Sequence, residues 1–192
     1  MKLLPERKGR FSVPEIRRWR GKDQLRLAGL LAAIGALSTM FAKVEIQIEG
    51  ADGWAANLPT WRLDHHWLLD VFWGGRPLTG YHVWVFLFMA VVFHLVFFLH
   101  GRPSLRLELR VLGSLAVFWI LEDFLWFVLN PAYGLSRFSP QCIPWHLHWM
   151  LGVPTDYVVC LGLGALMMGL SFRRRRPIPC RVAVMDAVLE GS

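Results

Sequence analysis

Four long apolar runs restrict what this chain can fold into. They cover residues 25–42, 83–99, 105–129 and 157–172. Each is close to the roughly 20 residues that a helix needs to cross about 30 Å of hydrocarbon. Hydrophobic residues make up 55% of the chain, which agrees with a membrane environment. We therefore predict an all-α integral membrane protein, a four-transmembrane-helix bundle that forms one membrane domain over residues 25–172.

The basic residues predict how the bundle is oriented. Seventeen of the 21 Lys and Arg residues lie before or at the start of the first run, between the second and third or near the start of the third, or after the fourth. Because basic residues near spans stay on the cytoplasmic side, we expect both termini to be cytoplasmic, with a basic arm at 1–24 and a basic tail at 173–192. We expect a bacterial inner membrane. The net charge of +7 then reflects topology, and no nucleic acid is expected as a partner.

Two segments, 43–82 and 130–156, are expected on the outer side, where they would form an ordered extracytoplasmic cap. From Val44 to Glu49, apolar and polar residues alternate, which indicates a short strand or an extended interfacial stretch. The second segment contains four prolines, whose fixed φ angles would make it rigid without regular structure.

Glu122 and Asp123 form an acidic pair inside the third apolar run. Ionisable residues within a span are costly and therefore indicate a functional site by default. We take both as candidate catalytic residues and candidate metal ligands. The alternative is a structural pair that clamps two helices through hydrogen bonds.

Histidines expected on the same side would complete a metal shell. His146 and His148 are two residues apart, so in an extended backbone their side chains would point the same way and could chelate one ion. His82, His65 and His66 are further candidate ligands. A shell of histidines and carboxylates suits Fe, Zn or Mn. The alternative is a set of interfacial histidines among belt tryptophans.

His94 lies midway along the second run and is a candidate cofactor-binding residue. It could ligate a haem or a chlorophyll-type pigment axially. This is disfavoured because no other run carries a histidine at similar depth. The motifs H-E-x-x-H and G-x-S-x-G are absent, and no known family is assigned.

The leading hypothesis is a small inner-membrane metalloprotein whose outer-face site acts on a hydrophobic or lipid-like substrate. Whether it is an enzyme is left open. The alternative is a non-catalytic subunit of a respiratory or photosynthetic complex that binds partner subunits, lipid, quinone or pigment. A proton-relaying carrier is disfavoured, because four helices form a small pathway. Expected partners are membrane lipids, with other membrane subunits or further copies of the chain.

Overall fold

The computed structural model describes residues 21–101 and 103–172. It is mostly helical, and four helices are long and apolar enough to span a membrane: α1 (Gly21–Glu49), α3 (Gly80–His100), α4 (Leu105–Leu129) and α5 (Thr155–Phe172). The prediction of four helices long and apolar enough to span a membrane is confirmed, and it suggests an integral membrane protein. The predicted tail at 173–192 and residues 1–20 of the predicted arm lie outside the described residues, and the last four residues of that arm belong to α1.

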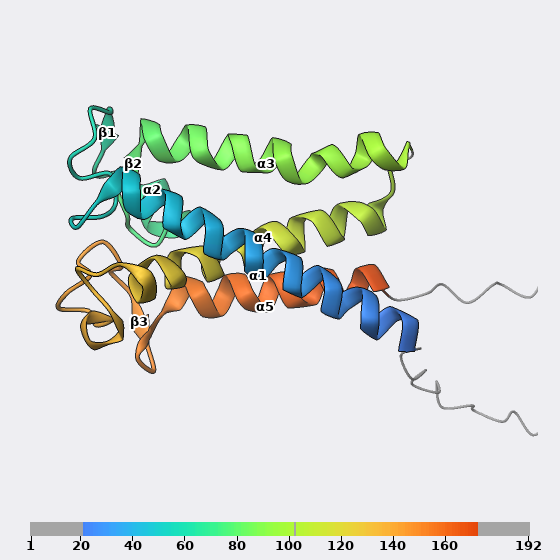
Figure 1. Ribbon diagram of the computed structural model, residues 1–192. Helices are drawn as coiled ribbons and strands as arrows, with labels where there is room; N and C mark the ends of the chain where they lie inside the picture. The colour runs from blue at the N-terminus through green and yellow to red at the C-terminus, as the bar shows by residue number, and fades with distance from the viewer. Residues whose placement is uncertain (1–20, 102, 173–192) are drawn as a thin grey trace, which may run out of the picture.

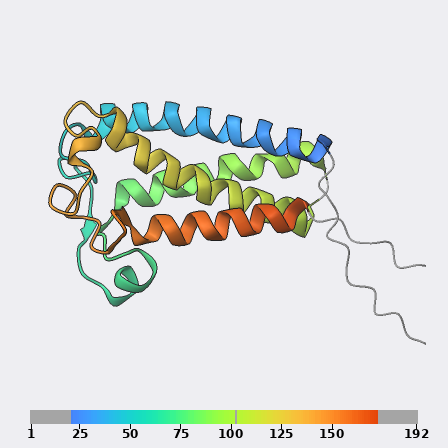
Figure 2. The ribbon, with the colours of Figure 1, turned by 90° about the horizontal axis from the view of Figure 1, so that it is seen from below.

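The four helices run up and down beside one another (Figures 1 and 2). The described chain begins and ends at one end of the bundle, and the long connections lie at the other (Figure 1). These connections contain α2 (Trp67–Phe72), the 3-10 helix η1 (Leu135–Arg137) and two short antiparallel pairs. The first pair joins β1 (Arg62–Leu63) to β2 (Leu78–Thr79), and the second joins β3 (Trp149–Met150) to β4 (Val153–Pro154). We call the end of the bundle that carries these long connections the loop end.

Local sequence signals explain where α3 and α4 begin and end. Thr79 caps α3, because its hydroxyl accepts a hydrogen bond from the amide of His82. Gly101 follows α3 with φ of 65°, the left-handed conformation that glycine adopts without a steric penalty. Ser104 then caps α4 through the amide of Leu107. The bounds of α4 agree with the predicted run 105–129.

The extended stretch predicted from Val44 to Glu49 is wrong, because these residues are the last turns of α1. Six residues make fewer than two helical turns, so the alternation is too short to distinguish a strand from a helix, whereas the spacing of four puts Glu45 and Glu49 on one helical face. Glu45 and Glu49 are buried, whereas Val44 and Ile48 are exposed. The predicted outer segment 43–82 therefore begins only after Glu49 and ends before Gly80, and His82 belongs to α3.

Helix α4 lies at the centre of the bundle. It packs extensively against α5 and α1 and less against α3. Gly113 of α4 and Gly164 of α5 allow the closest approach, because a Cβ on Gly113 would stand 2.8 Å from the Gly164 carbonyl oxygen. On the opposite face, the hydroxyl of the buried Ser38 in α1 donates to the carbonyl of Phe118 at 3.1 Å.

Asn130 ties the loop end to the helices. Its amide nitrogen Nδ2 donates to the Gly50 carbonyl at 3.0 Å, just after α1, while its Oδ1 accepts from the amide of Ala132. Nearby, the buried residues Ala42, Ile46, Trp126, Phe127 and Ile143 form an apolar cluster. The loop that follows α4 is thus held against the last turns of α1.

Candidate functional site

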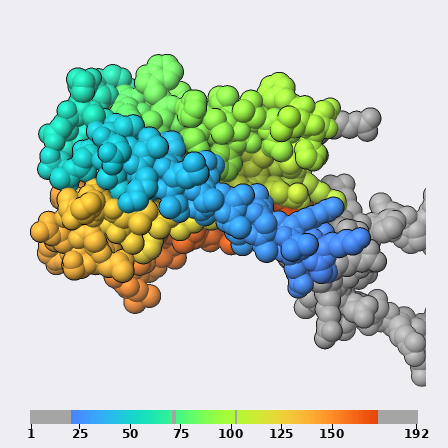
Figure 3. Space-filling model, viewed as in Figure 1, coloured from blue at the N-terminus to red at the C-terminus, as the bar shows by residue number. Residues whose placement is uncertain are grey.

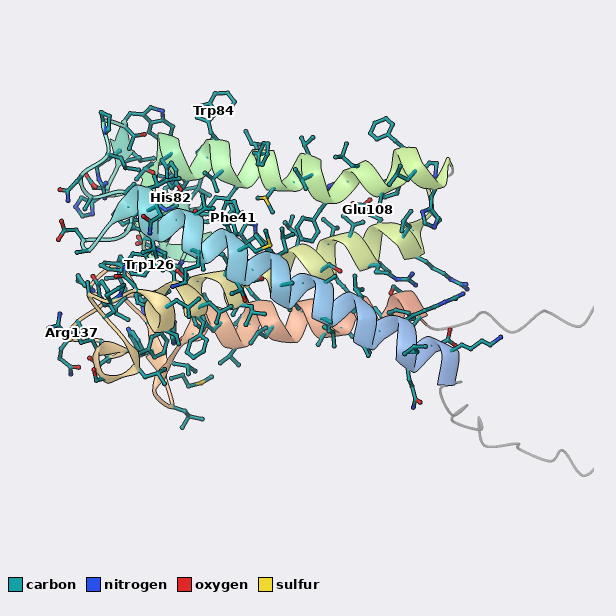
Figure 4. The ribbon with its side chains drawn as sticks, viewed as in Figure 1. Phe41, His82, Trp84, Glu108, Trp126 and Arg137 are labelled. Atoms are coloured by element: carbon teal, nitrogen blue, oxygen red, sulfur yellow. The ribbon has the colours of Figure 1, made fainter. Side chains whose placement is uncertain are left out.

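A cavity of about 260 Å³ lies inside the loop end of the bundle. Its wall comes from all four long helices and from the loops that follow α1 and α4. Figure 4 shows two of its lining residues, His82 and Trp126, near this end, while Glu108 lies toward the opposite end. Five carboxylate side chains line the cavity: Glu45, Glu49, Glu122, Asp123 and Asp156.

Helix α1 contributes two carboxylates one turn apart. The Tyr81 hydroxyl donates to Glu45 Oε1 at 3.1 Å, and the Ala55 amide donates to Glu49 Oε1 at 2.7 Å. Both glutamates are buried, with exposures of 7% and 8%. Neither of these two donors carries a positive charge, so they stabilise a carboxylate less than an ion pair would.

Glu122 is the most deeply buried of the glutamates, with an exposure of 3%. Within the described part of the chain, its Oε1 has no hydrogen-bond partner. The indole nitrogens of two other lining residues, Trp73 and Trp126, are likewise buried and without an acceptor there. Buried polar atoms are normally paired, so these atoms leave hydrogen-bonding capacity for a molecule in the cavity.

Asp123 lies next in the sequence but has several polar partners. Its Oδ2 accepts from His146 Nε2 at 3.1 Å and from the Tyr157 hydroxyl at 2.5 Å. Arg76 forms an ion pair with Asp156, whose Oδ1 stands 3.6 Å from His146 Nδ1. We call these five residues the Asp123 network.

Of the two basic side chains of this network, His146 is buried, whereas the Arg76 side chain keeps 13% of its surface exposed. Burial lowers the pKa of His146, and the hydrogen bond to Asp123 opposes that change. Burial also lowers the pKa of the Arg76 guanidinium, with the charge of Asp123 acting in the opposite direction. The guanidinium carbon of Arg76 stands 5.0 Å from the ring centroid of Trp54, a cation–π contact.

His82 of α3 also lines the cavity, and it contacts the same indole of Trp54 as Arg76 does. Its Nδ1 is 2.6 Å from the Thr79 hydroxyl, and its Nε2 is 3.7 Å from Glu49 Oε1. The imidazole stacks on the indole of Trp54 with ring centroids 4.1 Å apart. Its orientation is therefore fixed on three sides.

Aromatic rings form most of the remaining wall. The rings of Phe86 and Trp119 are tilted against each other, with centroids 4.2 Å apart. The ring centroids of Trp126 and Trp145 are 6.5 Å apart in an edge-to-face arrangement. The lining aromatic residues are Trp54, Trp73, Phe86, Trp119, Trp126, Phe127 and Trp145. The cavity thus combines a high density of carboxylates with an aromatic surface.

The structure brings together only part of the set predicted from the sequence. Glu122, Asp123 and His82 line the cavity, and His146 adjoins it through Asp123. His65, His66 and His148 are exposed at the loop end and do not line the cavity. Among the residues that the structure describes, no group of three or more His, Cys, Asp or Glu side chains has an arrangement that could hold a metal ion.

His94 lies away from this cavity. Its Nδ1 donates to the Ala90 carbonyl at 2.6 Å, and its Nε2 stands 3.3 Å from Glu108 Oε1. Both ring nitrogens thus have protein partners, which agrees with a role in joining α3 to α4.

Sequence reasoning missed four charged residues of the site: Glu45, Glu49, Arg76 and Asp156. All four were assigned to the outer loops and served only to predict topology. One signal was present: the spacing of four between Glu45 and Glu49 puts both on one face of a helix. Nothing in the sequence pattern indicated that Arg76 would meet Asp156.

No family model, curated protein or solved structure matches the chain. Function is therefore inferred from the geometry and chemistry of the cavity.

Proposed function

We propose that this integral membrane protein binds a positively charged group in the cavity at its loop end. The observation that carries this proposal is the imbalance of charge around the cavity. Five carboxylates line it, whereas its only basic lining side chains within the described residues are Arg76 and His82.

Within the Asp123 network, the positive charge of Arg76 is already paired. Arg76 pairs with Asp156, while Asp123 accepts two hydrogen bonds from His146 and Tyr157. This leaves Glu45 and Glu49 of α1 with neutral donors and His82, and Glu122 of α4 with an Oε1 that has no partner among the described residues. A buried carboxylate without a counter-charge is costly, so either protons or a cationic ligand must compensate for it.

The aromatic wall favours a cationic ligand. Indole and phenyl faces attract cations, and this attraction strengthens where water is excluded. A volume of about 260 Å³ is slightly below the roughly 300–1,000 Å³ that is typical of drug-sized ligands, so the bound group is small. Glu122, with its unpaired oxygen, supplies the central charge.

Binding of tetramethylammonium tests this function. In maltoside micelles, whose neutral head groups do not compete, titration calorimetry at constant ionic strength should detect binding by the wild type. Glu122→Gln keeps the shape of the side chain but removes its charge. We expect it to weaken binding by about 2 kcal/mol or more, which is more than tenfold.

Glu108→Gln is the matched control, because Glu108 is another α4 carboxylate that lies near the opposite end of the bundle. It should bind tetramethylammonium as the wild type does. Absence of binding by the wild type, or equal binding by the Glu122→Gln variant, would contradict the proposal and leave the glutamates as protonated structural groups.

A divalent metal, Fe, Zn or Mn, is the second candidate for the cation. It is favoured by the approach of His82 Nε2 to Glu49 Oε1 at 3.7 Å, with Glu45 and Glu122 in the same cavity, and these side chains would have to move closer together to form a metal shell. Such a metal would polarise an oxygen or activate water for chemistry on a hydrophobic substrate. Elemental analysis of chelator-washed protein distinguishes a metal from an organic cation. Near-stoichiometric metal in the wild type that is lost in the Glu122→Gln variant would favour the metal.

The outward face of α3 supports the alternative of a subunit in a larger membrane complex. Trp84, Phe98 and Leu99 on this helix are 71%, 84% and 86% exposed. These side chains would contact lipid or a partner subunit. Co-purification of a defined partner from native membranes would favour this role.

The distribution of basic residues supports cytoplasmic termini and a cavity that faces the outer side of a bacterial inner membrane. Cys142 is exposed at the loop end and reports this topology. In a variant with Cys160 and Cys180 replaced by Ser, a membrane-impermeant maleimide added to intact spheroplasts should label Cys142. Labelling only after the membrane is broken would reverse the orientation.

A further inference from the structure

A second hollow lies on the outer surface of the seam between α1 and α3. Phe41, Val44 and Ile48 of α1 line it together with Tyr81, Trp84 and Phe88 of α3. We call it the α1–α3 groove. Several of these side chains are largely exposed, with Val44 at 52%, Phe88 at 61% and Trp84 at 71%. Because both helices are candidate spans, this surface would face the lipid chains.

The groove and the acidic cavity share one wall. Along α1, Val44 and Ile48 line the groove, while their neighbours Glu45 and Glu49 line the cavity. The same alternation occurs on α3, where Tyr81 lines the groove and His82 lines the cavity. The two spaces therefore lie on opposite sides of a single layer of side chains.

The seam between α1 and α3 is filled by side chains, because the two helices do not pack tightly against each other. Helix α1 packs on α4 and has few contacts with α3, and Figure 1 shows the two helices on separate levels. Figure 3 shows their side chains adjoining near the loop end. The hydrogen bond from the Tyr81 hydroxyl to Glu45 Oε1, 3.1 Å long, crosses the seam. Tyr81 and Glu45 therefore stand between the groove and the cavity.

We propose that the ligand is a single-chain amphiphile with an ammonium head, which places its head in the cavity and its hydrocarbon chain in the α1–α3 groove. This rests on the proposed function and adds the class of ligand and its route of entry. The polar head would pass from the membrane between Tyr81 and Glu45.

The chemistry of the two spaces supports this ligand over other membrane molecules. The three glutamates that lack a cationic partner in the Asp123 network repel an anionic head group, whereas aromatic faces and carboxylates together attract an alkylammonium. The exposed apolar side chains of the groove match a hydrocarbon chain, which needs no hydrogen bonds. A free small cation would leave the groove without a role.

Photo-crosslinking of a long-chain alkyltrimethylammonium with a diazirine at mid-chain tests the proposal. With wild-type protein in maltoside micelles, adducts mapped by mass spectrometry should fall on the groove, at Val44, Trp84 and Phe88. Saturating tetramethylammonium should abolish these adducts, because it occupies the cavity that holds the head group. An alkyl sulfate probe with the same hydrocarbon chain is the control. Any labelling of the groove by this probe should be unaffected by tetramethylammonium.

Filling the groove provides a second readout. Val44→Trp should reduce labelling by the ammonium probe, whereas Leu31→Trp, at an exposed position elsewhere on α1, should not. Adducts spread evenly over the exposed faces of the helices would overturn the proposed ligand even if tetramethylammonium binds. Absence of tetramethylammonium binding would instead overturn the proposed function itself.

Discussion

Replacement of Asp123 by alanine is expected to destabilise the protein more than any other single change in the cavity wall. The substitution removes the acceptor for two buried donors, His146 Nε2 and the Tyr157 hydroxyl. His146 and Tyr157 are only 4% and 5% exposed, so water cannot readily replace the carboxylate. Leaving a buried donor unpaired costs roughly 1–3 kcal/mol, so we expect a loss of about 3 kcal/mol or more.

Reversible unfolding in mixed micelles would measure this loss. Asp123→Asn keeps one carbonyl acceptor and should lose less than Asp123→Ala. Glu108→Ala is the control, since the Glu108 carboxylate is partly exposed and its polar side-chain contact within the described residues is the one to His94. A stability of Asp123→Ala within the error of Glu108→Ala would show that the Asp123 network does not hold the loop end together.

Replacement of Gly113 by alanine is expected to separate α4 from α5. The added Cβ would stand 2.8 Å from the Gly164 carbonyl oxygen and 2.9 Å from Met168 Cγ. Because one of these neighbours is backbone, a helix must move. Overpacking of this kind typically costs about 1–3 kcal/mol, and here it would also shift the helix that carries Glu122 and Asp123.

Gly162→Ala supplies the comparison, because no atom lies within 4 Å of the position that its Cβ would take. Alanine favours a helix over glycine by up to about 1 kcal/mol in water, so this change should be neutral or stabilising. The two variants should therefore change the unfolding midpoint in opposite directions or by clearly different amounts. A Gly113→Ala variant as stable as Gly162→Ala would contradict this prediction. It would mean that α4 and α5 can move apart without a loss of folding free energy.

Both predictions concern α4, and the position of this helix explains why the site forms there. Its opposite faces pack on α1 and α5, so consecutive residues face different neighbours. Glu122 lines the cavity with an Oε1 that has no hydrogen-bond partner among the described residues, while Asp123 joins the loop and α5 through His146 and Tyr157. The acidic pair therefore divides into a residue suited to a ligand and a residue that holds the wall.

The sequence predicted the helices well because the apolar runs depend on local composition. For α4 the predicted bounds and the observed bounds agree. The other three helices extend beyond the apolar runs, because polar residues continue a helix where their side chains are buried or lie next to a helix cap. Glu45 and Glu49 show this most clearly, since they continue α1 although their charges indicated an outer loop.

The site was predicted in part. The cost of charge in a membrane pointed to Glu122 and Asp123, which line the cavity. Residue type alone could not separate the buried His146 from the exposed His148, because their environments depend on how the loop folds back on α4 and α5. The predicted metal shell stays a prediction, and the cavity adds two glutamates of α1 to its candidate ligands.

Composition and hydropathy by themselves determined that the chain forms four helices long and apolar enough to span a membrane and that an acidic pair lies within one of them. Both follow from the energy of placing single residues in hydrocarbon. Only the tertiary structure decided which charges meet. The burial of Glu45 and Glu49 opposite Glu122, the pairing of Arg76 with Asp156 and the aromatic wall all depend on contacts between residues far apart in sequence. Such contacts are set by the way the helices and loops pack, which no local pattern records.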